Sequence, residues 1–151
     1  MTVQRAEREP QTVVGLREVV PMSGLTGYFG RAFGAAAGEL ARLGEVPAGP
    51  PVALYRGPVT DSVDVTAGFP VRQPVVPAAG LVVATLPGGS TVEALHVGPY
   101  DSLPTTYSEV TGWIADHGLS AGEEMWEEYL VGPDSEADPG RWQTRIVFPV
   151  S

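Results

Sequence analysis

The chain has 151 residues, of which 43% are apolar and 18% charged, and this composition is typical of a single globular domain. Eighteen acidic residues against nine basic ones give a net charge of −9, which argues against binding of nucleic acids or of anionic membranes. The sequence contains no cysteine, so disulfides, thiol catalysis and zinc–thiolate sites are excluded.

We expect no signal peptide from the first part of this sequence. Its first twenty residues lack the apolar segment of a signal peptide, and no apolar run approaches membrane-spanning length. We therefore expect a cytoplasmic protein.

The first half of the chain predicts strands on both sides of one helix. Residues 25–44 have helical spacing of apolar side chains, with Gly44 at the end. The predicted strands are 2–6, 12–20, 51–58 and 62–71.

The same order of elements returns in the second half. Residues 102–118 predict a helix, with Ser102 as its N-cap. The turn Pro87-Gly88-Gly89 is typical of a hairpin and should join the first two of these strands. The predicted strands are 81–86, 90–97, 125–133 and 141–150.

The two halves also share short sequence anchors. "ALYRGP" (53–58) aligns with "EEYLVGP" (127–133), and "FPV" occurs at 69–71 and at 148–150. We interpret the chain as a tandem duplication within one domain, 1–151, with repeats of about 1–71 and 80–151. Chance similarity between turns rich in glycine and proline is the alternative. The predicted fold class is α+β, with two pseudo-symmetric repeats around a central groove.

The segment "MWEEYLVGP" (125–133) raises a question, because it places two carboxylates in an apolar strand. Side chains of a strand alternate, so Glu127 and Tyr129 share one face while Glu128 points to the other. The repeat aligns Tyr55 with Tyr129 and Ala53 with Glu127, so the carboxylate occurs in one half only. This asymmetry favours a functional role for Glu127. The alternative is a solvated glutamate on an edge strand, and we expect Glu128 to be the solvated one.

The second half contains a series of motifs in a fixed order: His96-x-Gly98-Pro99-Tyr100, Trp113, Glu127-x-Tyr129, Pro133 and Trp142-x-Thr144-x-Ile146-x-x-Pro149-Val150. Their order and spacing resemble the GyrI-like small-molecule-binding domain, which is also the effector-binding domain of AraC- and MerR-type multidrug regulators. The resemblance covers essentially the whole chain.

The resemblance implies that aromatic, often cationic, amphipathic molecules bind in a central cleft. It implies a ligand-binding role for Glu127 and Tyr129, with Tyr55, Ala53, Trp142 and Phe148 as further candidates. Trp142 and Phe148 lie on a strand face that is more typical of a protein core than of a cleft. No regulator-type DNA-binding domain is predicted beside the duplication.

Two other functions remain open for the same fold. Some members of the family resemble hydrolases that open the cyclopropane rings of DNA-alkylating natural products. In such an enzyme Glu127 would activate water and Tyr129 would stabilise the developing oxyanion. Other members antagonise gyrase inhibitors through protein contacts. We predict no metal site and no cofactor, because the only imidazoles are His96 and His117. The sequence does not predict the oligomeric state.

Overall fold

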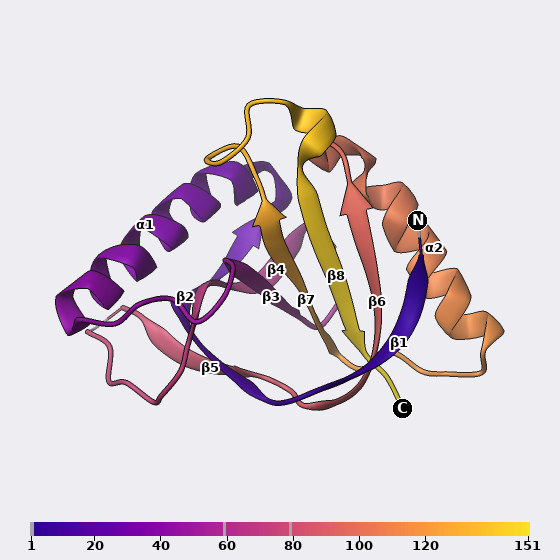
Figure 1. The fold of residues 1–151 in the computed structure, drawn as a ribbon, viewed down its shortest axis with the longest axis horizontal. Coiled ribbons are helices and arrows are strands. Elements are labelled where there is room, and N and C mark those ends of the chain that lie inside the picture. The colour runs from indigo at the N-terminus through magenta and orange to yellow at the C-terminus, as the bar shows by residue number, and fades with distance from the viewer. Residues whose placement is uncertain (1, 59, 79) are drawn as a thin grey trace. The chain divides into compact units, whose positions relative to one another are not determined.

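The computed structural model describes residues 2–58, 60–78 and 80–151, and the chain folds into two compact units (Figure 1). Unit 1 consists of Met1–Glu9 and Gly88–Ser151, and unit 2 of Pro10–Pro87. Each unit is a four-stranded antiparallel sheet with one α-helix, which confirms the predicted α+β class with eight strands and two main helices.

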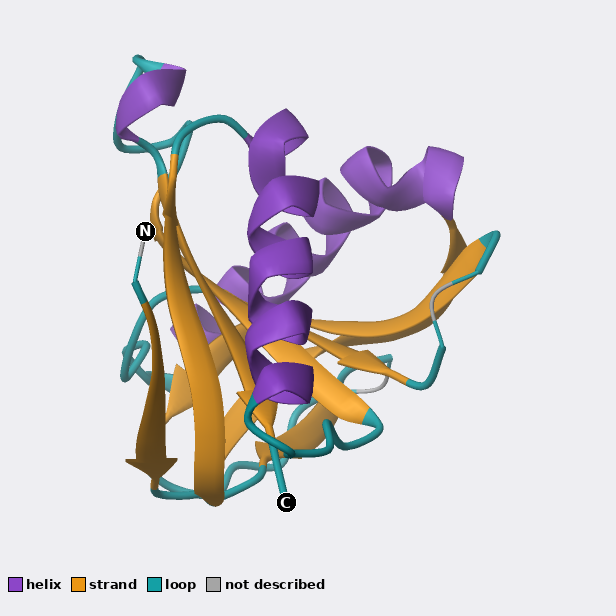
Figure 2. Ribbon diagram, turned by 90° about the vertical axis from the view of Figure 1, so that its right-hand side faces the viewer, coloured by secondary structure: helices purple, strands orange, loops and turns teal. Residues whose placement is uncertain are grey.

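Unit 1 packs helix α2 (Leu103–Asp116) against one face of its sheet (Figure 2). Its strands, in sheet order, are β1 (Val3–Arg8), β6 (Gly89–Val97), β8 (Gln143–Pro149) and β7 (Glu124–Val131). The apolar stripe of the helix meets the even-numbered side chains of β6, because these share the helix-covered face. The core of this contact is Val92, Ala94, Val110 and Ile114.

Unit 2 has the corresponding helix α1 (Leu25–Leu43), which packs on β2 and β4. Its strands, in sheet order, are β3 (Val52–Arg56), β4 (Ser62–Val71), β2 (Gln11–Pro21) and β5 (Val82–Leu86). Gly15 and Gly68 lie opposite each other where β2 and β4 approach closely, and a Cβ atom on Gly15 would lie 2.5 Å from the carbonyl oxygen of Ala67. The fully buried Tyr28 hydroxyl lies against these strands and accepts the Ala67 amide hydrogen at 2.9 Å.

The pairing registers of the two units are equivalent, as a duplication requires. Val14 pairs with Phe69 in unit 2, and Val92 pairs with Phe148 in unit 1. A row across three strands reads Tyr129, Thr144, His96 in unit 1 and Tyr55, Val65, Glu18 in unit 2. The next row reads Glu127, Ile146, Ala94 in unit 1 and Ala53, Ala67, Leu16 in unit 2. Glu127 therefore corresponds to Ala53, as the sequence anchors indicate.

The predicted hairpin at Pro87-Gly88-Gly89 is wrong. β5 pairs with β2, whereas β6 pairs with β1 and β8. The chain passes from one unit to the other at this turn, and it does so a first time between β1 and β2. A turn sequence indicates that the chain changes direction, but it does not select the strand that supplies the hydrogen bonds.

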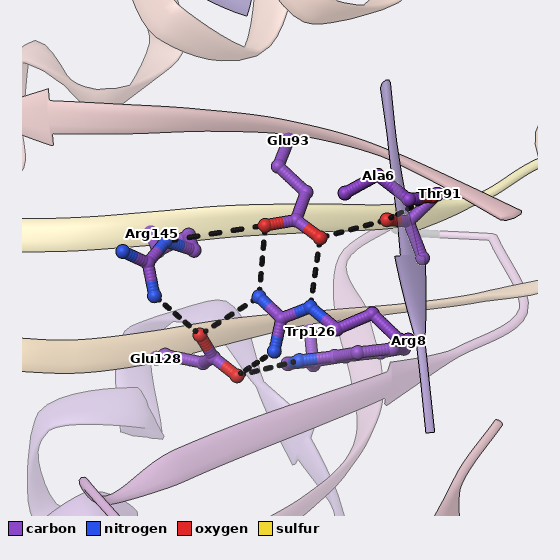
Figure 3. Close-up of polar contacts among 7 residues, drawn as sticks. All are labelled: Ala6, Arg8, Thr91, Glu93, Trp126, Glu128 and Arg145. Atoms are coloured by element: carbon purple, nitrogen blue, oxygen red, sulfur yellow. Dashed lines mark hydrogen bonds and ion pairs between the residues drawn. The ribbon is translucent and has the colours of Figure 1, made fainter. Parts of the chain in front are cut away.

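Glu128 is not solvated, contrary to expectation, and only 5% of it is exposed. Figure 3 shows the reason: the guanidinium of Arg8 binds the carboxylates of both Glu93 and Glu128. Arg145 contacts Glu128 at 3.3 Å from the side, and the indole of Trp126 donates a hydrogen bond to the same carboxylate. Two arginines and two glutamates thus neutralise each other on the sheet face opposite to α2.

The pKa values of this ion-pair network agree with its geometry. Hydrogen bonding to Glu93 raises the pKa of Arg8 above its ordinary value, although burial opposes this effect. Burial would raise the pKa of Glu93, but hydrogen bonds from Arg8 and Thr91 outweigh it and hold that pKa below its usual value. Both groups of this pair are therefore held in their charged forms.

We expect Glu128→Ala to destabilise the protein by about 2–4 kcal/mol, because it leaves two guanidinium groups with a single carboxylate, that of Glu93. The lower end applies if water reaches Arg8 and Arg145, whose side chains are 24% and 37% exposed. Urea unfolding measures the loss. Glu123→Ala, at an exposed site, should change the stability by less than about 0.5 kcal/mol. An equally small effect of Glu128→Ala would show that the ion pairs of Glu128 do not stabilise the fold.

Candidate functional site

Glu127 lies on the face of β7 that α2 covers, and 6% of it is exposed. Its carboxylate accepts hydrogen bonds from two phenols. The Tyr129 hydroxyl donates to Oε1 at 2.6 Å, and the Tyr107 hydroxyl donates to Oε2. Tyr129 comes from the same strand two residues on, and Tyr107 from the first half of α2. The strand period and the helix stripe together place both hydroxyls on one carboxylate.

Burial raises the pKa of Glu127 above its ordinary value of 4.5. The hydrogen bonds from Tyr107 and Tyr129, and the nearby His96, act in the opposite direction without reversing the shift. The carboxyl group is therefore held in a site that disfavours its charge. A positive group that entered this site would remove that penalty.

The other buried glutamates form ion pairs with arginines, whereas Glu127 does not. In the described part of the chain four glutamates are buried: Glu39, Glu93, Glu127 and Glu128. Arg42 pairs with Glu39 at 2.7 Å, and Arg8 pairs with Glu93 and Glu128. Glu127 forms no ion pair with a lysine or arginine among the described residues. The protein thus neutralises three buried carboxylates with its own arginines and leaves the fourth to phenol hydroxyls.

Five aromatic rings of unit 1 form a connected group that includes Tyr107 and Tyr129, the two phenols on this carboxylate, and we refer to them as the aromatic cluster. They are Tyr100, Tyr107, Tyr129, Trp142 and Phe148. The Tyr100 ring lies 4.9 Å from that of Trp142 and 6.2 Å from that of Tyr129, measured between centroids. The rings of Tyr107 and Phe148 meet edge to face at 6.1 Å. Tyr100 is the most open of the five, with 37% of it exposed.

Two further polar groups lie on the same sheet face. Thr144 pairs across the strands with Tyr129 on one side and with His96 on the other. Its hydroxyl is fully buried and has no hydrogen-bond partner within the described residues. A buried hydroxyl of this kind can accept or donate a hydrogen bond to a bound molecule.

The structure brings together most of the predicted site residues. Tyr129 donates a hydrogen bond to Glu127, whereas Trp142 and Phe148 belong to the same aromatic cluster through their contacts with Tyr100 and Tyr107. Tyr55 and Ala53 lie on β3 of unit 2, where Tyr55 is half-buried and Ala53 is fully buried. Ligand contacts by those two residues stay a prediction.

Sequence reasoning missed two members of the aromatic cluster. Tyr107 lies on the apolar stripe of the predicted helix, where a core tyrosine is the ordinary interpretation. Tyr100 belongs to the motif His96-x-Gly98-Pro99-Tyr100, but no periodicity connects that motif to β7. The indirect signal for both was the isolated carboxylate itself, which needs hydrogen-bond donors close by.

A β-bulge lies at the end of β7, directly after Tyr129. Tyr129 pairs with Thr144, but Val131 pairs with the adjacent residue Gln143, so Leu130 is the extra residue. Bulges of this kind occur next to functional sites, where they redirect side chains. Beyond the bulge, Gly132 lies so near the Tyr100 hydroxyl that a Cβ atom there would be 3.1 Å from it.

The described residues contain no group of three or more histidine, cysteine or acidic side chains that could hold a metal ion. None of the helices in that part of the chain is long and apolar enough to cross a membrane.

Solved structures with this fold include a protein in complex with DNA, a protein bound to an aromatic cation and a hydrolase. The C-terminal domain of EcmrR matches 99% of this chain and 97% of its own, with a TM-score of 0.87 and 23% identity. In the EcmrR–DNA complex the chain spans 57% of the length of EcmrR, with a TM-score of 0.84 and 22% identity. SAV2435 bound to tetraphenylphosphonium matches with a TM-score of 0.71 and 15% identity, over 100% of this chain and 94% of that one. A hydrolase from Listeria innocua matches with a TM-score of 0.69 and 18% identity, over 99% and 92%.

None of the curated proteins matches this chain in sequence. The family model of the GyrI-like small molecule binding domain matches residues 1–151. The protein belongs to the GyrI-like small-molecule-binding family.

Proposed function

We propose that the protein binds amphipathic aromatic cations at Glu127, within the aromatic cluster of unit 1. The observation that carries this proposal is the absence of an arginine or lysine partner for Glu127 among the described residues, when the other three buried glutamates all have one. A buried carboxylate is costly unless a positive charge accompanies it. A cationic ligand would supply that charge.

The aromatic cluster supports the same ligand class. The faces of tyrosine and tryptophan rings attract cations by about 0.5–2 kcal/mol each. Rings also bury the apolar part of an amphipathic molecule, which adds a hydrophobic contribution. Tetraphenylphosphonium, the ligand of SAV2435, belongs to this class. The chemistry suits sensing or sequestration of many compounds, because stacking and one charge discriminate shape weakly.

We expect tetraphenylphosphonium or a rhodamine dye to bind with a micromolar dissociation constant, or about −8 kcal/mol. Glu127→Gln should weaken binding about tenfold or more, because it removes the charge and keeps the volume. Isothermal titration calorimetry measures both constants. The affinity for triphenylphosphine oxide, which is neutral, should change much less on this substitution.

Glu123→Gln is the matched control, because it removes one negative charge from an exposed site near the same strand. It should leave the affinity within about twofold, since a solvated charge acts only through a screened field. Equal affinities of the wild type and Glu127→Gln for the cation would rule out Glu127 as the binding group.

Glu127→Gln should also stabilise the empty protein at neutral pH, by about 2–4 °C in Tm for each kcal/mol gained. The pKa of Glu127 is raised in the folded state, so the folded protein favours the protonated form. Below about pH 4.5, the ordinary pKa, the wild type carries no penalty. Its stability relative to the variant should fall as the pH rises above that value through the raised pKa. Thermal unfolding of both proteins across this range measures the difference, and a variant less stable than the wild type at pH 7 would contradict it.

We propose hydrolysis as a second candidate, favoured by the raised pKa of Glu127 between two phenols. A carboxyl group of this kind suits proton transfer to or from water, and a phenol can stabilise an oxyanion. The substrate class would be a cyclopropane-bearing alkylator, whose strained ring opens when water adds.

Incubation with such a compound should then give repeated turnover, detected by mass spectrometry as the gain of one water. Glu127→Gln should abolish this turnover, and Tyr129→Phe should lower it by a smaller factor, because Tyr107 remains. Turnover that persists in Glu127→Gln would remove Glu127 from the chemistry.

A further inference from the structure

The segment between β6 and α2 carries Tyr100, the most exposed ring of the aromatic cluster. It leaves the strand at Gly98, whose φ of +135° favours glycine, and then forms the short 3-10 helix η2 (Tyr100–Ser102). The Gly98 amide donates a hydrogen bond to the carbonyl of Trp142 at 2.8 Å. The position of Tyr100 next to Trp142 therefore depends on the conformation of this short segment.

The side chain of His96 lies beneath this segment and contacts it. Only 4% of His96 is exposed. Its Nε2 lies 3.0 Å from the Pro99 carbonyl oxygen and 3.0 Å from Ser102 Oγ. A carbonyl oxygen can only accept, so Nε2 carries a hydrogen and donates it. Nδ1 lies 2.7 Å from Thr106 Oγ1, in the first turns of α2. One imidazole thus connects the end of β6, the 3-10 turn and the helix.

This arrangement is not a nucleophile with its base. Ser102 Oγ donates to the Pro99 carbonyl at 2.8 Å, so its hydrogen does not point to His96. Ser102 occupies the N-cap position of α2, as predicted, but makes no side-chain capping bond there. Its hydroxyl stabilises the turn instead, through the hydrogen bond to the Pro99 carbonyl.

The fold itself does not require His96. By pairing register the corresponding residue in unit 2 is Glu18, which is paired with Arg31 near the surface. Unit 2 still forms the corresponding 3-10 helix, η1 (Met22–Gly24), directly before its α-helix. The His96 network is therefore specific to the half of the chain that contains Glu127.

We infer that His96 is a positioning residue for ligand binding, which fixes the turn from Gly98 to Ser102 so that the Tyr100 ring forms one wall of the site. This inference rests on the proposed binding function. The Tyr100 phenol interacts electrostatically with the buried carboxylate. Burial raises the pKa of this phenol, and the charge of Glu127 adds to that effect.

A double-mutant cycle tests the inference, with tetraphenylphosphonium as the probe. His96→Leu should weaken binding about tenfold in the wild-type background and less than about twofold in Tyr100→Ala, because its effect passes through that ring. His96→Gln should restore most of the affinity, since its amide can donate to the Pro99 carbonyl. His117→Leu, at the exposed histidine on the far end of α2, is the control and should have no effect. A tenfold loss in both backgrounds, or equal affinities of His96→Gln and His96→Leu, would overturn the inference.

A second measurement on the ligand-free protein separates this inference from the proposed function. The nuclear Overhauser contact between the Tyr100 and Trp142 rings should be lost in His96→Leu and kept in His96→Gln. If it persists in His96→Leu, the histidine does not position Tyr100. If the wild type fails to bind the cation but this contact behaves as expected, the proposed function fails while the positioning role stands.

Discussion

The alternation of side chains along β7 is the constraint on which the site depends. Glu127 and Glu128 are neighbours in the chain, yet the strand period sends them to opposite faces of the sheet. Glu128 meets Arg8 and Arg145 and is neutralised within the protein. Glu127 meets Tyr107 and Tyr129 and keeps its need for a positive charge. A single strand thus places Glu128 in an ion-pair network and Glu127 at the proposed binding site.

The two units keep equivalent pairing registers although only unit 1 carries this carboxylate, so the fold does not depend on it. Where unit 1 has Glu127 and Ile146, unit 2 has Ala53 and Ala67, and these small side chains let the Tyr28 hydroxyl reach the strands. By the offset between the repeats, Thr106 occupies the position of Tyr28 on the second helix. A threonine side chain is shorter than a tyrosine side chain, so the imidazole of His96 can lie between the helix and the strand and contact Thr106. The two halves share a backbone plan but differ in what fills the space between helix and sheet.

The sequence was sufficient where local periodicity decides the structure. It placed both helices, Glu127 beside Tyr129, and the correspondence of Ala53 with Glu127, which the pairing registers confirm. It failed for Glu128, because the partner that buries it, Arg8, lies 120 residues away in the chain. It failed at Pro87-Gly88-Gly89 for a similar reason, since β5 and β6 take hydrogen bonds from strands distant in sequence. Pairing between residues distant in the chain produces no periodic pattern in the sequence, so these features could be seen only in the structure.

The hydrogen bonds around Glu127 also bear on which cations the proposed site would prefer. Both carboxylate oxygens already accept a phenol hydrogen. A primary ammonium needs acceptors for its own hydrogens and would compete with Tyr107 and Tyr129 for them. A quaternary phosphonium or a delocalised aromatic cation has no such need, so it can bring its charge near the carboxylate while both phenols stay in place. It also loses less hydration on entering an apolar site than an ammonium does. In the proposed site the phenols would therefore favour cations without hydrogen-bond donors, because both carboxylate oxygens already accept a hydrogen and only the charge is left for the ligand.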